Sequence, residues 1–137
     1  MAEPSAFVLD TFALLAYLQN EPAAARVEQL LEQAAKEKCQ LFVSIINLGE
    51  LLYIIERRAG PTKTQETLAL IEQLPVKILP ADEPAVFSAA HVKAAQALSY
   101  ADAFAVAAAM QTNACILTGD AEFKAVEQMV RVEWLAK

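Results

Sequence analysis

The chain has 137 residues, of which 56% are hydrophobic and only three are glycine, a composition that excludes a disordered or collagen-like protein. The formal net charge of −6 argues against a passive nucleic-acid coat, because phosphate binding normally requires an excess of cations. The length suits one compact domain over residues 1–137, and the large apolar share predicts that a second copy or another protein covers part of the surface. No apolar run approaches the ~20 residues that span a bilayer, and the N-terminus lacks a basic signal segment, so we expect a cytoplasmic protein.

Short apolar runs alternate with helical patterns over the first half of the chain. Pro22 is expected to open the second helix, since proline fits the first helical turn, and Gly60 with Pro61 is expected to stop the third. In chain order, the predicted segments are a strand at 6–10, helices at 11–18 and 22–38, a strand at 40–44 and a helix at 45–58.

The second half of the chain continues this alternation. The helix that begins near Asp102 is apolar on every side, which predicts burial. Strands that alternate with helices favour right-handed crossovers, so we predict an α/β fold with a mostly parallel sheet of four to five strands and helices on both faces. In chain order, the predicted segments are a helix at 62–74, a strand at 76–79, helices at 82–98 and from about 102, a strand at 115–118, a helix at 120–129 and a possible edge strand at 130–135.

Four acids stand at unusual places in this pattern. Asp10 and Asp120 follow the first and fourth strands, where an open parallel sheet gathers its ligands. Glu50 lies on a largely apolar helical stripe, and Asp102 is the one charged residue within 94–119. A buried, uncompensated carboxylate costs several kcal/mol, a large part of the ~5–15 kcal/mol that stabilises a domain. These acids are therefore either satisfied separately or converge around a shared cation.

Separate structural roles are available for each acid. Aspartate is a preferred N-cap, so each strand-end acid could cap the helix that follows it. Ser99 and Asp102 have a spacing that resembles a capping box, and Glu50 could pair with Arg57.

Convergence of the four acids has a different consequence. Carboxylate ligands select Mg²⁺ or Mn²⁺, while Cys39 and Cys115 have no spacing that could build a zinc site. A bound divalent ion can activate water and hold a phosphodiester, so this alternative predicts metal-dependent phosphodiester hydrolysis. Thr118 could hydrogen-bond a carboxylate or a ligand water there, or be an ordinary strand-end residue.

The segments that contain these acids resemble a known family. "VLDTFALLAYL", "SIINLGELLYII", "LSYADAFAVAAAM" and "ILTGDAEFKAV" are similar, in order and spacing, to the acidic motifs of PIN-domain nucleases, and most closely to those of VapC-type toxins of bacterial and archaeal toxin–antitoxin pairs. The resemblance extends over nearly the whole chain. It implies a PIN-like fold, a metal-dependent endoribonuclease activity on an RNA substrate, a small cognate antitoxin and a homodimer.

The resemblance also implies roles for individual residues. The metal-binding quartet would be Asp10, Glu50, Asp102 and Asp120, and Thr118 matches the hydroxyl residue before the last acid.

Three further features qualify these implied roles. Glu122 would be an outer-shell acid or a solvated helix residue, and Phe12 stands where the family often has a small polar residue, which puts the catalytic rate or substrate fit in doubt. Nearby cations would assist RNA binding: Arg57, Arg58, Lys63, Lys93 and Lys124.

Two alternatives to a ribonuclease are open from the sequence. The high apolar content and Phe12 are compatible with a catalytically weak PIN module that acts mainly through protein–protein binding. A phosphotransfer receiver or a haloacid-dehalogenase-like phosphatase is disfavoured, because "VLDTF" lacks the second aspartate of such a phosphatase and no paired acids near the start or late lysine of a receiver are evident.

Overall fold

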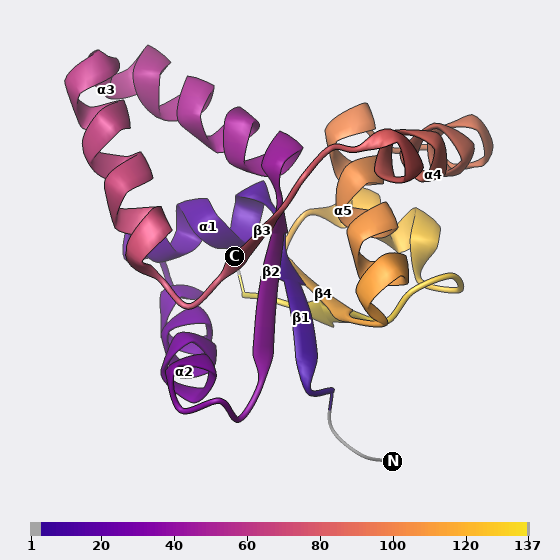
Figure 1. The fold of residues 1–137 in the computed structure, drawn as a ribbon, viewed down its shortest axis with the longest axis horizontal. Coiled ribbons are helices and arrows are strands. Elements are labelled where there is room, and N and C mark those ends of the chain that lie inside the picture. Colours follow the sequence, from indigo (N-terminus) through magenta and orange to yellow (C-terminus); the bar gives the residue numbers. More distant parts are fainter. Residues whose placement is uncertain (1–3, 137) are drawn as a thin grey trace.

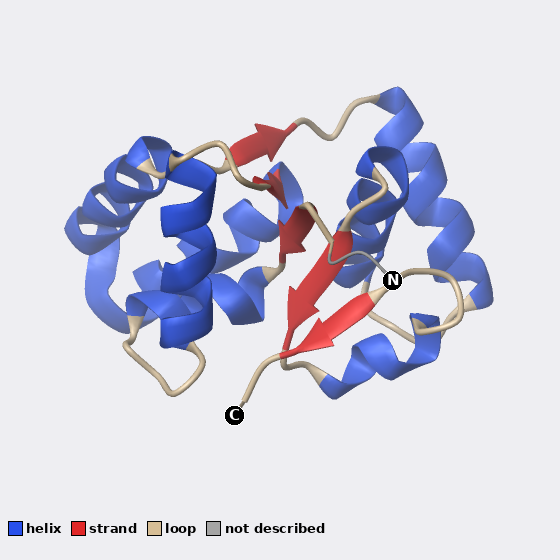
Figure 2. Ribbon diagram, turned by 90° about the horizontal axis from the view of Figure 1, so that it is seen from below, coloured by secondary structure: helices blue, strands red, loops and turns tan. Residues whose placement is uncertain are grey.

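Five parallel strands form the centre of the structure, in the order β3-β2-β1-β4-β5 (Figures 1 and 2). The computed structural model describes residues 4–136. The strands are β1 (Ala6–Leu9), β2 (Gln40–Ser44), β3 (Lys77–Leu79), β4 (Cys115–Thr118) and β5 (Val132–Trp134). The predicted α/β fold with a parallel sheet is confirmed, and the possible edge strand is present as β5.

Helices cover both faces of this sheet, as Figure 1 shows. The first three helices lie on one face, and α4 and α5 lie on the other. Their bounds are α1 (Thr11–Leu18), α2 (Ala24–Ala35), α3 (Ile45–Gln73), α4 (Glu83–Ala95), α5 (Tyr100–Thr112) and the 3-10 helix η1 (Ala121–Val126). Among residues 4–136, no helix combines the length and apolar character needed to cross a membrane.

Two apolar cores explain why the central strands are largely apolar. Successive side chains of β1 point to opposite faces, so that Phe7 and Leu9 pack with α1, α2 and α3, whereas Val8 packs with α4 and α5. A sheet that is covered on both faces has no solvated side, which removes the need for polar residues along its strands. The small side chains of α5, including Ala103 and Ala105, are completely buried in the second core.

Two local features differ from the sequence expectations, and a third agrees with them. Pro22 does not open α2, which begins at Ala24 after Ala23 as N-cap. The stop predicted at Gly60 is confirmed, because a sharp break at this residue (φ 87°, ψ 173°) separates two helical segments within α3. The helix expected over 120–129 is the shorter η1, in which i and i+3 side chains lie above one another and both are fully buried: Phe123 and Val126.

The carboxyl ends of the strands place the acidic motifs at one edge of the sheet. β1 and β4 are hydrogen-bonded neighbours, and Leu9 pairs with Leu117, so the residues that follow them come close together. β2 is the neighbour of β1 on the other side and leads directly into α3. The parallel topology therefore brings the ends of three segments, distant in sequence, to the same place.

Candidate functional site

Asp10 and Thr118 form the buried centre of this edge. The Thr118 hydroxyl donates to Asp10 Oδ2 (2.5 Å), and the Ala13 amide donates to Asp10 Oδ1 (2.9 Å), so that Asp10 caps α1. The Asp120 amide in turn donates to Thr118 Oγ1 (3.0 Å). Asp10 thus fulfils the predicted capping role and still directs its second oxygen toward β4.

At the start of α5, the side chain of Asp102 takes no part in the helix cap. Ser99 is the N-cap, and its hydroxyl accepts from the Asp102 amide (3.1 Å), which is one half of a capping box. The other half is missing, because the Ser99 amide donates to Glu122 Oε1 (3.0 Å) instead of to the Asp102 side chain. Glu122 therefore replaces Asp102 in the cap, and this leaves the Asp102 carboxylate to face other acids.

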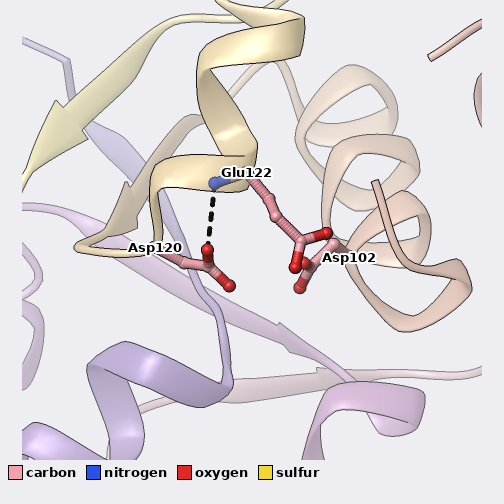
Figure 3. A group of neighbouring side chains, drawn as sticks. All are labelled: Asp102, Asp120 and Glu122. Carbon is pink, nitrogen blue, oxygen red and sulfur yellow. Dashed lines mark hydrogen bonds between the residues drawn. The ribbon is translucent and has the colours of Figure 1, made fainter. Parts of the chain in front are cut away.

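Asp102, Asp120 and Glu122 bring their carboxylates together (Figure 3). One oxygen from each of the three lies within 4.8 Å of the others. Asp120 is held by its cap on η1, in which the Glu122 amide donates to Asp120 Oδ1 (2.9 Å). In Figure 3 the Glu122 side chain extends from η1 toward the start of α5, where it meets Asp102. Asp10 and Glu50 are not members of this tight group.

Glu50 approaches the site from the second turn of α3. Its Oε1 accepts a hydrogen bond from the Thr11 hydroxyl (2.6 Å), which also donates to the backbone oxygen of Asn47 (3.1 Å). The alternative in which Glu50 pairs with Arg57 or with a distant lysine is not found among residues 4–136, and the Arg57 guanidinium lies over the Tyr53 ring, 5.1 Å from its centroid. Thr11 therefore orients Glu50 from the first turn of α1.

Burial makes Asp10 an unusual acid. Its side chain is 1% exposed, and burial raises its pKa from 3.8 to about 7. Hydrogen bonds from Thr118 and Ala13 lower the pKa, whereas the negative charges of Asp102 and Asp120 raise it. The ionised form of Asp10 is stabilised by neighbouring donors but destabilised by the lack of water.

Asp102 has a similar electrostatic environment. Burial and the negative charges of Asp120, Glu122 and Glu50 together raise its pKa to about 7, while the Ser99 hydrogen bond lowers it. Asp102 therefore interacts electrostatically with each of the other three predicted acids and with Glu122.

Among residues 4–136, no lysine or arginine forms a salt bridge with these carboxylates. Within residues 4–136, the one salt bridge joins Arg26 to Glu133 (2.7 Å), on the side of α2 and β5. Carboxylates that converge with raised pKa values and without a basic partner suit a hard divalent cation, which accepts oxygen ligands and needs no histidine or cysteine. The donor set of this edge therefore fits Mg²⁺ or Mn²⁺.

Sequence reasoning missed several contributors to the site. Glu122 was expected only as a possible outer-shell acid, although it belongs to the tight group, and no role was expected for Thr11.

Asn47 is a buried amide beside the acids. It donates through Nδ2 to the backbone oxygen of Ala101 (3.2 Å), and its buried Oδ1 has no partner among the described residues. A polar amide three residues before Glu50 was the available signal.

Two other sequence expectations concern the surroundings of the acids. The ring of Phe12 covers Gly119, between Thr118 and Asp120, and its effect on catalytic rate or substrate fit stays a prediction. The cations expected to assist RNA binding are all exposed: Arg57, Arg58, Lys63, Lys93 and Lys124.

Comparisons with known proteins agree with this architecture. Residues 7–128 match the family model of the PIN domain. The VapBC2 structure from Rickettsia felis, bound to a DNA fragment from their promoter, is similar with a TM-score of 0.75 at 17% identity, over 96% of this chain and 99% of that chain. A search of curated protein sequences found no significant match.

Two further solved structures are similar over most of their length. FitAcB from Neisseria gonorrhoeae has a TM-score of 0.67 at 24% identity, over 92% of this chain and 95% of that chain. VapC20 from Mycobacterium tuberculosis, a sarcin-ricin loop cleaving toxin, has a TM-score of 0.69 at 16% identity, over 88% of this chain and 94% of that chain. At these identities the likeness establishes a shared fold, while the family match extends over most of the sequence. The chain belongs to the PIN-domain family.

Proposed function

We propose that the protein is a Mg²⁺- or Mn²⁺-dependent endoribonuclease that acts as the VapC-type toxin of a type II toxin–antitoxin pair. The observation that supports this most directly is the convergence of acids that form no salt bridge with a cation in the described part of the chain. Asp10 and Asp102 are 1% and 6% exposed, and the pKa of each is raised to about 7. Such a group of carboxylates is costly for a domain unless a cation binds there.

The proposed ligands are Asp10, Glu50, Asp102 and Asp120. Glu122 joins them as a further candidate because of its place in the tight group. When bound, the ion would activate a water molecule and offset negative charge on the phosphodiester and its leaving oxygen.

The chain's own residues would preorganise this site. Thr118 orients Asp10 through its hydroxyl, and Thr11 does the same for Glu50. The carboxylates must lose their protons to bind a metal ion, so we expect metal affinity to increase as the pH rises through about 7, the value to which burial raises the pKa of Asp10.

An RNA substrate and an antitoxin partner are part of the same proposal. Among proteins with this fold, VapC20 is a sarcin-ricin loop cleaving toxin, and VapBC-5 from Mycobacterium tuberculosis is a member of the VapBC family of toxin–antitoxin systems. Partner binding is also supported by large apolar side chains that stay exposed on this chain, although isolated exposed apolar residues are common. Those on the helices are Ile45, Tyr53, Leu70, Phe87, Tyr100 and Met110. We propose an antitoxin and a homodimer as the proteins that cover them, and the cytoplasm as the place of action.

Cleavage assays test the enzymatic part of this proposal. The purified protein is treated with EDTA and incubated with single-stranded or structured RNA, with and without added Mn²⁺. We expect cleavage only with the metal, and a loss of cleavage in Asp10→Asn and Asp102→Asn. The matched control is Glu127→Gln, which also removes one negative charge but at an exposed residue that accepts a bond from Trp134. Cleavage without metal, or at the native rate in Asp10→Asn, would contradict a metal-dependent nuclease.

A second experiment separates the enzyme from a pure binding module. The chain is co-expressed with a short protein encoded directly upstream of it, and the purified complex is examined by sedimentation and by calorimetry with Mn²⁺. A toxin should form the complex and also bind Mn²⁺ when freed from it. Complex formation without any Mn²⁺ binding would instead favour the catalytically weak module.

A further inference from the structure

The turn between β4 and η1 contains a glycine that lies under an aromatic ring. Gly119 is buried, and a Cβ at this position would overlap the ring of Phe12, which belongs to the first turn of α1. Of the described glycines, Gly60 alone has a positive φ, so Gly119 does not occupy the left-handed region that favours glycine. The space taken by the Phe12 ring, and not the backbone conformation, therefore restricts residue 119 to glycine.

This contact joins the two segments that carry buried parts of the site. Phe12 lies two residues after Asp10, and Gly119 lies between Thr118 and Asp120. The Thr118 hydroxyl donates to Asp10 (2.5 Å) and accepts from the Asp120 amide (3.0 Å), while the ring covers the glycine between them. Phe12 is half-buried and packs against the core of the α1–α2–α3 face. A pair of hydrogen bonds and an apolar contact thus hold the same turn.

We propose that Phe12 is a positioning residue that holds the 118–120 turn against α1 and so keeps the Asp120 carboxylate near Asp102. The role rests on the proposed function, because it assigns to an apolar side chain the preorganisation of one proposed metal ligand. Phe12 acts by occupying the space above Gly119. Residues that support metal ligands in this way typically change metal affinity by about 10–100-fold when they are replaced.

Amide hydrogen exchange in the metal-free protein tests the turn itself. The Asp120 amide donates to Thr118 and the Glu122 amide donates to Asp120, so both report on the order of the turn. We expect Phe12→Ala to accelerate exchange selectively at these two amides, and Phe12→Leu, which refills most of the space, to restore their protection. The control is Leu30→Ala, which empties a buried position of α2 in the same core. A uniform acceleration in Phe12→Ala, like that in Leu30→Ala, would overturn the proposal.

The sizes of residues 12 and 119 provide an independent test. Gly119→Ala should lower the midpoint of unfolding strongly in the native background. The double variant Phe12→Ala/Gly119→Ala should unfold at or above the midpoint of Phe12→Ala alone, because the new methyl group occupies space that the ring has left. If Phe12→Ala does not fold, Phe12→Val, which also leaves most of the space of the ring empty, allows the same comparison. If the decreases in the unfolding midpoint of the two single variants add up in the double variant, the contact with Phe12 is not the reason for glycine at position 119.

Calorimetry with Mn²⁺ distinguishes this proposal from the proposed function. We expect Phe12→Ala to bind Mn²⁺ about 10-fold more weakly than the native protein or weaker still, and Leu30→Ala to bind it with native affinity. Native affinity in Phe12→Ala would overturn the positioning role. A native protein that binds no Mn²⁺ would overturn the proposed function, while the exchange and size experiments would still decide the role of Phe12.

Discussion

Thr118 donates a hydrogen bond to Asp10 at 2.5 Å and thereby joins two residues that are 108 positions apart in the chain. Both side chains are buried, because their strands are parallel neighbours and end at the same edge of the sheet. The same hydroxyl accepts from the Asp120 amide, so one side chain orients one proposed ligand and anchors the turn that carries another. A hydroxyl in this place is a structural requirement of the site as well as a feature of its motif.

Removal of the Thr118 hydroxyl should therefore weaken both stability and activity. Thr118→Val keeps the shape of the side chain but leaves a buried oxygen of Asp10 and the Asp120 amide without this partner. We expect a loss of about 1–3 kcal/mol in the free energy of unfolding, measured in urea, and slower RNA cleavage. Thr118→Ser retains the hydroxyl and should stay close to the native protein in both measurements. Native cleavage by Thr118→Val would show that the hydroxyl does not orient the site.

The stability of the metal-free protein should decrease as the pH rises from about 4 to 7. The pKa of Asp10 is about 7 in the folded protein, against 3.8 for the unperturbed group, so the folded state binds more protons than the unfolded state in this window. The stabilisation is complete below pH ~4 and is lost as the pH passes through 7, with a slope of at most about 1.4 kcal/mol per pH unit for each such group. Asp102, whose pKa is also raised to about 7, contributes to the same decrease in stability with rising pH.

Asp10→Asn should remove part of this pH dependence. The amide has no charge to bury and can still accept the Ala13 bond, so the variant should be more stable than the native protein at pH 8 without metal, although it should be inactive. Urea unfolding of EDTA-treated samples at pH 5 and pH 8 measures the difference. The interpretation would be wrong if the native protein gained stability over this range relative to Asp10→Asn.

Loss of the Thr11 hydroxyl should weaken metal binding more than it weakens the fold. Thr11 donates to Glu50 at 2.6 Å, and Thr11→Val frees that carboxylate to move. We expect Mn²⁺ affinity to fall about 10–100-fold, with a loss of about 1 kcal/mol in unfolding free energy. Thr112→Val is the matched control, since Thr112 also donates from its hydroxyl, to the Ala108 backbone oxygen at 2.8 Å. Equal Mn²⁺ affinities in the two variants would argue against a role for Thr11 in orienting Glu50.

The variant Glu122→Gln tests whether Glu122 is a metal ligand or only an acid on the helix surface. Glutamine can still accept the bond from the Ser99 amide, so the start of α5 should be preserved. Loss of the charge should lower the pKa of Asp102, because Glu122 raises it, and should weaken Mn²⁺ binding if the carboxylate is a ligand. Carbon-detected NMR titration of Asp102 and calorimetry measure the two effects, with Glu127→Gln as the control. If neither the pKa of Asp102 nor the Mn²⁺ affinity changes in Glu122→Gln, this residue is not part of the site.

Much of the fold follows from local patterns in the sequence. The strands at 6–10 and 115–118 are recognisable because a strand covered on both faces must be apolar, and the alternation with helices predicts parallel pairing. Asp10 and Asp120 could be expected at one edge for the same reason. The caps that the sequence suggested for these two acids are also present, and each leaves its carboxylate at the edge where the acids gather.

The association of particular side chains was decided by the tertiary structure. From the sequence, Glu122 could be an outer-shell acid or a solvated helix residue. In the structure it is exposed, yet it accepts from the Ser99 amide and its carboxylate lies with those of Asp102 and Asp120. Phe12 appeared to be a departure from a motif, yet its ring explains why residue 119 is glycine.

The sequence by itself determined the parallel α/β architecture and the edge at which its acids gather, because burial on both faces imposes apolar strands and short connections. The partners of each acid, the burial that raises their pKa values and the contact between Phe12 and Gly119 depend on distances between segments far apart in the chain. Such distances follow from how the helices pack on the sheet, and no local pattern of residues encodes them.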